Sequence, residues 1–167
     1  MMDFQLTEEQ QELQRWARNF AKEKFSEKAF TWHKTGQVPW ENAKILAEHG
    51  LMGMTLPEED GGQGRSLIDA LIVMEEIAKV CPHTADMFQV GNFGAIRQVA
   101  AYGSKELKKR VLPPILAGEK LISVAMSEPN AGSATTDLQT TARIEGDKVI
   151  INGSKVFNTH GPYNSFY

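Results

Sequence analysis

The hydrophobic pattern of the chain changes near residue 120, and this change limits the possible folds more than any other feature. Before it, apolar residues recur at the three- and four-residue spacing of helices. After it, short β-rich runs alternate with turn residues. We therefore predict an α+β fold. An all-α helical N-terminal domain spans residues 1–120, and the start of an antiparallel, β-barrel-like domain spans residues 121–167.

Capping residues locate the first two helices. Thr7-Glu8-Glu9-Gln10 is a capping box, in which the Thr7 hydroxyl accepts from the Gln10 N–H and the Gln10 side chain reaches back. Apolar residues at helical spacing follow it and predict an amphipathic helix. After the mixed, polar stretch 26–37, Pro39 suits the first turn of a second helix, which Gly50 ends as a left-handed cap.

Two longer stretches predict the centre of the helical domain. Leu67–Ala78 is apolar on almost every side, which is typical of a central helix that neighbours pack against from several directions. Residues 84–102 are again helical. Within them, Gly91 and Gly94 either weaken the middle of the helix or allow another surface to approach closely.

Glycine and proline mark the remaining boundaries of the helical part. Residues 58–64 form an acidic, glycine-rich loop that we expect to be flexible. This loop is not a phosphate cradle, because it lacks a Gly-Lys-Ser/Thr ending and its acidic side chains would repel phosphate. Ser104 is a good N-cap for a last helix, which Pro113-Pro114 kinks or ends before Gly118 closes the section.

The C-terminal part predicts a buried strand over Leu121–Met126 and then an antiparallel meander. Its three strands are expected at residues 139–144, 149–151 and 155–159. A turn at residues 145–148 and the hairpin signal Asn152-Gly153 separate them. So few strands cannot cover both faces of a sheet, so we expect a partner or further polypeptide to supply the missing surface.

The loop Ser127-Glu128-Pro129-Asn130-Ala131-Gly132-Ser133 lies where the helical part meets the β part. A strand followed by a small-residue loop, rich in hydroxyls and free backbone N–H groups, is a common support for a polar ligand site. A plain connecting loop has the same local sequence. The residues alone leave both interpretations open.

Composition excludes several classes of function. The net charge of −3 shows no basic excess, which argues against a nucleic-acid partner. The single cysteine, Cys81, excludes an internal disulfide, and the four histidines are scattered, so the sequence does not predict a zinc site. Residues 1–4 lead directly into polar sequence without the features of a signal peptide, and no apolar run is long enough for a membrane span. We therefore expect a cytoplasmic protein.

Several motifs together resemble the acyl-CoA dehydrogenases, and they occur in the family's order with compatible spacing. They are the capped first helix, Leu56-Pro57-Glu58-Glu59-Asp60-Gly61-Gly62, Gly103-Ser104-Lys105-Glu106-Leu107-Lys108-Lys109, Leu112-Pro113-Pro114-Ile115-Leu116-Ala117-Gly118-Glu119, residues 127–133, and Asn152-Gly153-Ser154-Lys155-Val156-Phe157-Asn158-Thr159. The resemblance implies the first, helical domain of that family and the opening part of its middle β-domain.

The resemblance also implies a reaction. Members of the family hold FAD and oxidise an acyl-CoA thioester to the enoyl-CoA: a carboxylate removes the α-proton while the β-hydrogen leaves as hydride to flavin N5. In most members that base lies in a C-terminal helical domain, so we expect it beyond residue 167 and not in this chain. A homotetramer and an electron-transfer partner that is itself a flavoprotein are further implications.

By resemblance, two segments and one serine contribute to the site. Val124, Ala125, Met126 and Ser127 would lie along the isoalloxazine ring with polar groups toward its pyrimidine edge, where donors stabilise the reduced flavin. Phe157, Asn158 and Thr159 would bring an aromatic ring and a hydroxyl to the flavin. Residues 124–127 and 157–159 are called here the first and second flavin segments. Ser133 would lie near the CoA portion of the substrate.

The chain departs from the family pattern at five positions near these segments: Asn130, Ala134, Phe157, Asn158 and His160. Phe157 replaces a tryptophan and keeps a stacking face, although a phenylalanine on a strand is more often part of a core. The sequence therefore leaves two hypotheses for the function open. The first is an FAD-dependent acyl-CoA dehydrogenase part that is inactive alone, and the second is a non-catalytic module that binds acyl-CoA or another subunit.

Overall fold

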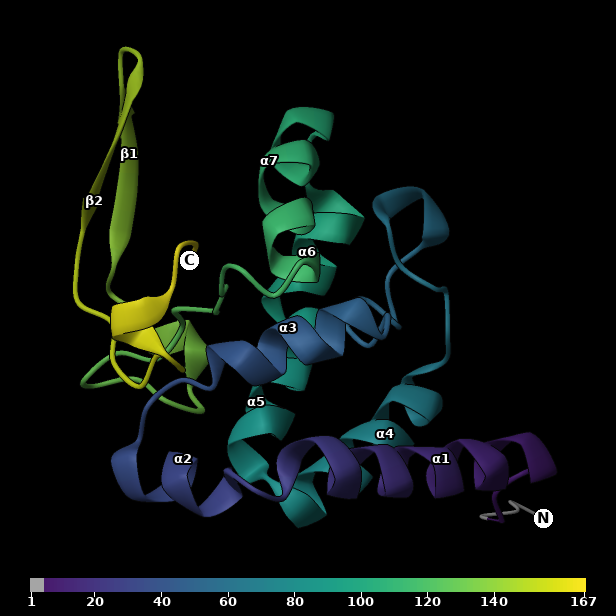
Figure 1. The fold of residues 1–167 in the computed structure, drawn as a ribbon. Coiled ribbons are helices and arrows are strands. Elements are labelled where there is room, and N and C mark those ends of the chain that lie inside the picture. Colours follow the sequence, from purple (N-terminus) through teal and green to yellow (C-terminus); the bar gives the residue numbers. More distant parts are fainter. Residues whose placement is uncertain (1–4) are drawn as a thin grey trace.

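Seven helices and one hairpin make up the computed structural model, which describes residues 5–167 (Figure 1). The helices are α1 (Glu8–Phe25), α2 (Ala29–Thr35), α3 (Trp40–Glu48), α4 (Leu67–Val80), α5 (Pro82–Asn92), α6 (Ala95–Tyr102) and α7 (Lys105–Leu116). The strands are β1 (Thr141–Glu145) and β2 (Lys148–Asn152). Residues 1–4, on which the signal-peptide argument partly depends, lie outside the described residues.

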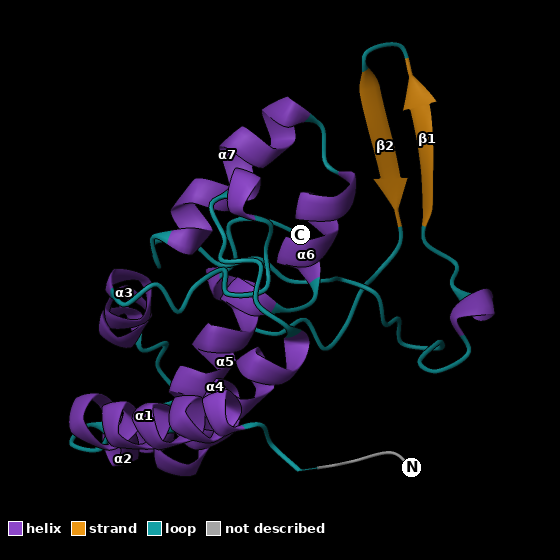
Figure 2. Ribbon diagram, turned by 90° about the vertical axis from the view of Figure 1, so that its right-hand side faces the viewer, coloured by secondary structure: helices purple, strands orange, loops and turns teal. Residues whose placement is uncertain are grey.

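The first helix follows the capping sequence. The Thr7 hydroxyl accepts from the Gln10 N–H at 3.2 Å, and the Gln10 side chain accepts from the Thr7 N–H at 3.1 Å, which confirms the capping box. α1 then runs alongside α4 (Figures 1 and 2). Its buried face includes Ala17, Phe20 and Phe25, and burying such side chains is the main stabilising term of the helical core.

A buried connector between α3 and α4 packs under α5, as the sequence of residues 51–57 indicates. Met54 and Leu56 are fully enclosed, and the Gly53 N–H donates to the Gly91 carbonyl at 3.0 Å. A Cβ on Gly91 would lie 2.7 Å from the Met52 side chain. Gly91 therefore permits the close approach of another surface, one of the two roles expected of it.

The stretch 84–102 is two helices instead of one. α5 ends at Asn92 and α6 begins at Ala95, with Gly94 between them at φ 61° and ψ −126°, a conformation that only glycine adopts readily. The buried Asn92 side chain donates to the carbonyls of Leu51 and Phe88, so the end of α5 is fixed to the connector. Gly94 thus interrupts the helix completely.

Two other helices differ from the expectations. α4 packs against α1 and α5 but is not covered on all sides, because Leu67, Ile68 and Leu71 in its first turns are each about half exposed. α7 begins at its Ser104 cap but continues through Pro113-Pro114 to Leu116. The cost of the missing N–H groups is offset by the buried side chains of that helix, including Leu112 and Ile115. The short helix α2 has no counterpart among the expected elements.

The acidic loop 58–64 is more ordered than a flexible linker. Glu58–Asp60 forms a 3-10 turn, and the Gly62 N–H donates to the Pro57 carbonyl at 3.0 Å. The Lys108 ammonium on α7 forms an ion pair with Asp60 at 2.9 Å. Backbone bonds and this ion pair therefore hold the loop against the helical body.

The β part contains a two-stranded hairpin. β1 and β2 pair antiparallel from Thr141↔Asn152 to Glu145↔Lys148, which confirms two of the three strands and their turn. All residues of both strands are exposed, and the hairpin projects away from the helices in both views (Figures 1 and 2). It carries outward-facing apolar side chains, since Ile144 is 81% and Ile151 71% exposed.

The third strand and the strand at 121–126 were predicted wrongly. Asn152-Gly153 ends β2 and does not form a hairpin turn, and Phe157 at φ 59° interrupts the extended backbone that a strand at 155–159 requires. In Leu121–Met126 only the first three residues are buried, and a single bridge joins Ile122 to Phe166. The described residues therefore show a mostly helical domain with a small sheet, without a barrel. The boundary at residue 120 stays a prediction.

Candidate functional site

The two flavin segments lie side by side although some thirty residues of sequence separate them. The Val156 N–H donates to the Ser127 carbonyl at 2.9 Å. The Lys155 ammonium donates to the Met126 carbonyl, also at 2.9 Å. The end of the first flavin segment is thus joined to the residues that lead into the second.

The first flavin segment presents a row of backbone donors. Among residues 5–167, no group accepts a hydrogen bond from the N–H of any residue from Val124 to Ser127. Val124 and Met126 are about half exposed, so this part of the backbone borders open space. The O2 and O4 carbonyl oxygens and the N1 atom of a flavin pyrimidine edge accept hydrogen bonds, and this donor set fits them.

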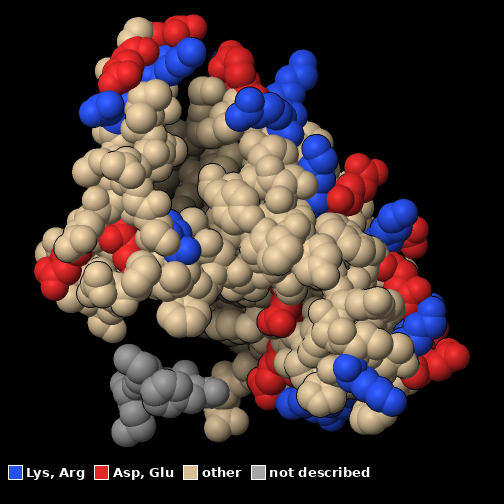
Figure 3. All heavy atoms as spheres, turned by 90° about the vertical axis from the view of Figure 1, so that its left-hand side faces the viewer, with Lys and Arg blue, Asp and Glu red and all other residues tan. Residues whose placement is uncertain are grey.

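Two cavities flank the segment that precedes this row. One of about 150 Å³ is lined by Val90, Phe93 and Gly94 from α5 and the α5–α6 break, by residues 122–124, and by Thr159. The other, of about 410 Å³, lies between α6, α7 and residues 122–125. Figure 3 shows a hollow between the hairpin and the helical body, bordered mainly by uncharged residues. The segment 122–124 forms a wall shared by both cavities.

The second flavin segment has one exposed aromatic side chain and one buried polar atom without a hydrogen-bond partner in residues 5–167. The Phe157 side chain is 94% exposed, so the interpretation of Phe157 as a core residue is wrong. The Thr159 carbonyl accepts from the Asn164 side chain at 2.8 Å. Within the described residues, the buried Oδ1 of Asn158 and Nε2 of His160 have no hydrogen-bond partner, and burial lowers the pKa of His160. Unpartnered buried polar atoms of this kind require a ligand or water to satisfy them.

Ser133 is the predicted substrate-binding residue of the loop 127–133. It lies exposed in the loop before the 3-10 turn Thr135–Asp137, and its carbonyl accepts from the Thr135 N–H at 3.0 Å. No hydrogen bond in residues 5–167 joins Ser133 to either flavin segment. The hydrogen bonds that connect the two flavin segments within residues 5–167 therefore do not include Ser133.

Glu128 and Lys155 are central to the site, and neither was among the predicted site residues. The buried Glu128 carboxylate accepts from the Gln139 N–H at 2.7 Å, the Thr140 N–H at 2.9 Å and Lys155 Nζ at 2.8 Å. The hydrogen bond from Lys155 is the largest cause that lowers the pKa of Glu128 to about 2. Each residue belongs to a motif that carries the family resemblance, and the presence of opposite charges in those two motifs was the available signal.

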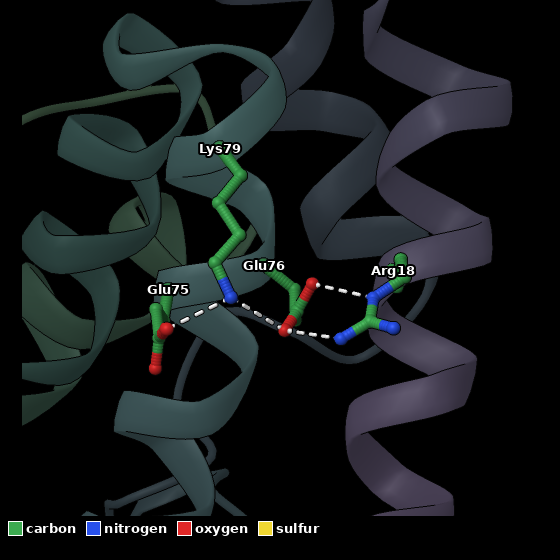
Figure 4. A network of polar contacts seen from close by, with 4 residues as sticks. All are labelled: Arg18, Glu75, Glu76 and Lys79. Atoms are coloured by element: carbon green, nitrogen blue, oxygen red, sulfur yellow. Dashed lines mark hydrogen bonds and ion pairs between the residues drawn. The ribbon is translucent and has the colours of Figure 1, made fainter.

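A second charged network lies away from these segments and joins α1 to α4. Arg18 and Lys79 contact the buried Glu76 carboxylate, and Lys79 also contacts Glu75 (Figure 4). Over residues 5–167 there is no group of three or more His, Cys, Asp or Glu side chains placed to hold a metal ion. None of the described helices has the length and apolar character that crossing a membrane requires.

Comparison with known proteins supports the fold assignment. The family model described as "Acyl-CoA dehydrogenase, N-terminal domain" matches residues 7–119. The 3-sulfinopropanoyl-CoA desulfinase of Variovorax paradoxus is 44% identical over 158 residues, which are 95% of this chain and 39% of that protein. The short-chain-specific acyl-CoA dehydrogenase of Clostridium acetobutylicum is 36% identical over 160 residues, 96% of this chain and 42% of that protein.

A solved structure gives the same result. The FAD complex of PigA superposes with a TM-score of 0.87 at 26% identity, over 99% of this chain and 44% of that one. The fold and the matches define a mostly helical N-terminal domain with a small antiparallel two-stranded sheet. The chain belongs to the acyl-CoA dehydrogenase family. It spans about two fifths of the length of the curated relatives it matches.

Proposed function

We propose that this chain provides part of the flavin and substrate site of an FAD-dependent acyl-CoA dehydrogenase. The observation that carries the proposal is the hydrogen bond from Val156 to Ser127, because it sets the two flavin segments beside each other. When bound, FAD supplies the acceptor for the hydride that leaves the β-carbon of the acyl chain. The chain's own residues would bind and orient the flavin and limit access of water.

Each flavin segment has a distinct role in this proposal. The free N–H groups of Val124, Ala125, Met126 and Ser127, with the Ser127 hydroxyl, would donate to the pyrimidine edge. The exposed Phe157 ring offers a face for stacking, and the Thr159 hydroxyl would reach toward the N5 side. The unpartnered Asn158 side chain adds a polar group that a ligand could satisfy. Ser133 is proposed to contact the CoA portion.

The catalytic base is proposed to lie outside residues 1–167. Within the flavin segments no carboxylate is available, and the nearby carboxylate of Glu128 is committed to three donors. A group bound so strongly in its ionised form is a poor acceptor for a substrate proton. Acyl-CoA oxidation therefore requires polypeptide in addition to this chain, together with the electron-transfer flavoprotein partner that we propose.

Titration with FAD tests the proposal directly. Purified chain is mixed with FAD, and the visible flavin absorption and the quenching of flavin fluorescence are followed to saturation. Saturable binding supports the proposal. A chain that remains colourless and leaves the fluorescence unchanged contradicts it and favours the alternative, a non-catalytic module that binds acyl-CoA or another subunit. Titration with an acyl-CoA then tests that module.

A second reaction has a specific observation in its favour. Four relatives between 40% and 44% identical are 3-sulfinopropanoyl-CoA desulfinases, whereas the acyl-CoA dehydrogenase of Clostridium acetobutylicum is 36% identical. Removal of the sulfinate group from 3-sulfinopropanoyl-CoA is therefore the alternative activity. With the protein that carries this sequence, a short acyl-CoA with an artificial electron acceptor and 3-sulfinopropanoyl-CoA are compared as substrates. Acceptor reduction supports the dehydrogenase, and loss of the sulfinate group supports the desulfinase.

Assembly and location are proposals as well. The exposed hairpin and the exposed first turns of α4 are compatible with further contacts, and we propose the homotetramer that the family resemblance implies. Sedimentation velocity of the protein that carries this sequence distinguishes a tetramer from smaller species. A cytoplasmic location, expected from the sequence, is also a proposal. Fractionation of cells that express the tagged protein tests it.

A further inference from the structure

The Glu128–Lys155 ion pair connects three separate pieces of chain around the flavin segments. Lys155 Nζ lies 2.8 Å from Glu128 Oε1 and 2.9 Å from the Met126 carbonyl, so one ammonium contacts two residues that lie on either side of Ser127. The same carboxylate accepts from the backbone of Gln139 and Thr140, directly before β1. Through these bonds Glu128 fixes both legs of the hairpin to the end of the first flavin segment.

The pair is largely shielded from water. The Glu128 side chain is 6% exposed and the Lys155 side chain 23%. A charge in such a place is tolerated because the opposite charge and further hydrogen bonds compensate its lost hydration. Removing one partner therefore leaves an uncompensated charge beside residues 126–128, while removing both restores neutrality.

The two members of the pair also sit directly next to the flavin segments in the sequence. Glu128 follows Ser127, and Lys155 comes two residues before Phe157. The hydrogen bond from Val156 to Ser127 joins the residues directly beside Lys155 and Glu128 in the sequence. Within residues 5–167 this bond and the two from Lys155 Nζ are the direct hydrogen bonds between residues 124–128 and residues 155–159. The Asn164 side chain adds an indirect connection, because it donates to the Ser123 hydroxyl at 2.7 Å and to the Thr159 carbonyl at 2.8 Å. The ion pair therefore sets the separation of the two flavin segments at the end near Ser127.

We propose that Glu128 and Lys155 are positioning residues for the flavin: their ion pair holds the two flavin segments at the separation that FAD requires and keeps the local charge neutral. This inference rests on the proposed function. It assigns no contact between either side chain and the flavin. Their effect is transmitted through the Met126 and Ser127 carbonyls and through the charge balance of the pair.

FAD affinity provides the first test on the 167-residue chain. Glu128→Gln and Lys155→Met are each expected to raise the FAD dissociation constant by about tenfold or more, and the double variant by no more than the worse single variant. The matched controls Lys148→Met and Glu145→Gln change exposed hairpin residues of the same types and should leave it within about twofold. Lys155→Arg should retain most of the affinity, because it keeps the charge.

The reduction potential of bound FAD separates charge positioning from a general loss of structure. Reduced flavin carries negative charge, so the unbalanced Lys155 cation in Glu128→Gln should raise the potential. The unbalanced carboxylate in Lys155→Met should lower it, and the double variant should return toward the wild-type value. A merely structural defect would shift both single variants in the same direction.

The outcomes separate this inference from the function on which it rests. If the wild-type chain does not bind FAD, both fail. If the wild-type chain binds FAD while Glu128→Gln and Lys155→Met bind it equally well and show unchanged potentials, the inference is overturned and the proposed function stands. If circular dichroism shows that Glu128→Gln does not fold, Lys155→Met against Lys155→Arg decides. Weakened FAD binding by Lys155→Met, with near wild-type binding by Lys155→Arg, supports the inference. Wild-type FAD binding by both Lys155 variants overturns it.

Discussion

The Arg18 guanidinium donates two hydrogen bonds to the Glu76 carboxylate, from Nε to Oε2 at 3.1 Å and from Nη2 to Oε1 at 3.2 Å. This pair joins α1 to α4, and Lys79 adds a third donor at 2.8 Å (Figure 4). The Glu76 side chain is 1% exposed, so its charge is stabilised by these partners and not by water. The hydrogen bond from Arg18 is the leading cause of the lowered pKa of Glu76.

Replacement of Glu76 should therefore destabilise the helical body. Glu76→Gln removes the charge that three donors share, and we expect the free energy of unfolding to fall by about 1–3 kcal/mol. Glu75→Gln is the matched control, because Glu75 is exposed and contacts only Lys79; it should change that free energy by less than about 0.5 kcal/mol. Urea denaturation followed by circular dichroism measures both. Equal midpoints for the two variants would contradict the role of the Arg18–Glu76 pair.

Acid should weaken the region around Glu128. Its pKa is about 2 in the folded chain against an ordinary 4.5, so between these values the unfolded chain binds more protons. The contribution of Glu128 to stability is then complete above about pH 4.5 and is lost as the pH falls toward 2. The difference in urea midpoint between wild type and Glu128→Gln should shrink over this window. A difference that stays constant from pH 6 to pH 2.5 would refute the prediction.

Glycine is required at position 62. A Cβ there would overlap the Leu56 carbonyl and lie 2.6 Å from the Gly53 carbonyl oxygen, so the connector backbone would have to move. Gly62→Ala should cost about 1–3 kcal/mol of unfolding free energy. Gly132→Ala is its control, because a Cβ at Gly132 meets no atom within 4 Å. Thermal denaturation compares the two, and a Gly62→Ala chain as stable as wild type would show that the loop is not packed as described.

Substitution of Phe157 should separate stability from binding. Its side chain is 94% exposed, so Phe157→Ala should change the unfolding free energy by less than about 0.5 kcal/mol. If the ring stacks on the flavin, the same variant should bind FAD about three- to tenfold more weakly, since aromatic contacts contribute about 0.5–1.5 kcal/mol. Thermal denaturation and FAD titration measure the two effects. Unchanged FAD affinity would remove Phe157 from the proposed site.

The starts of helices were predicted correctly from the sequence where a capping residue determines the local backbone conformation. The Thr7–Gln10 capping box and the Ser104 cap are confirmed because both depend on residues three positions apart. Of the two effects expected of Pro113-Pro114, a kink or an end of the helix, the end is wrong, because burial of the same helix in the core outweighs the local cost of proline. Tertiary packing of this kind is not visible in a short window of sequence.

The β part and the site show the same limit more strongly. The β1–β2 hairpin was predicted because its turn and its alternating residues are local. The third strand was not formed, because strand pairing depends on a neighbour that the described residues do not supply. The ion pair of Glu128 with Lys155 joins residues 27 positions apart, and neither composition nor spacing indicates which charges meet across that distance.

The hairpin also has a consequence for how the chain behaves at high concentration. Within residues 5–167, β1 and β2 pair only with each other, so each has one edge whose N–H and C=O groups have no neighbouring strand. Such edges, bearing exposed isoleucines at positions 144 and 151, are templates for intermolecular strand addition. The ten residues of β1 and β2 are therefore a site at which aggregation can begin, and a covered edge would protect the chain there.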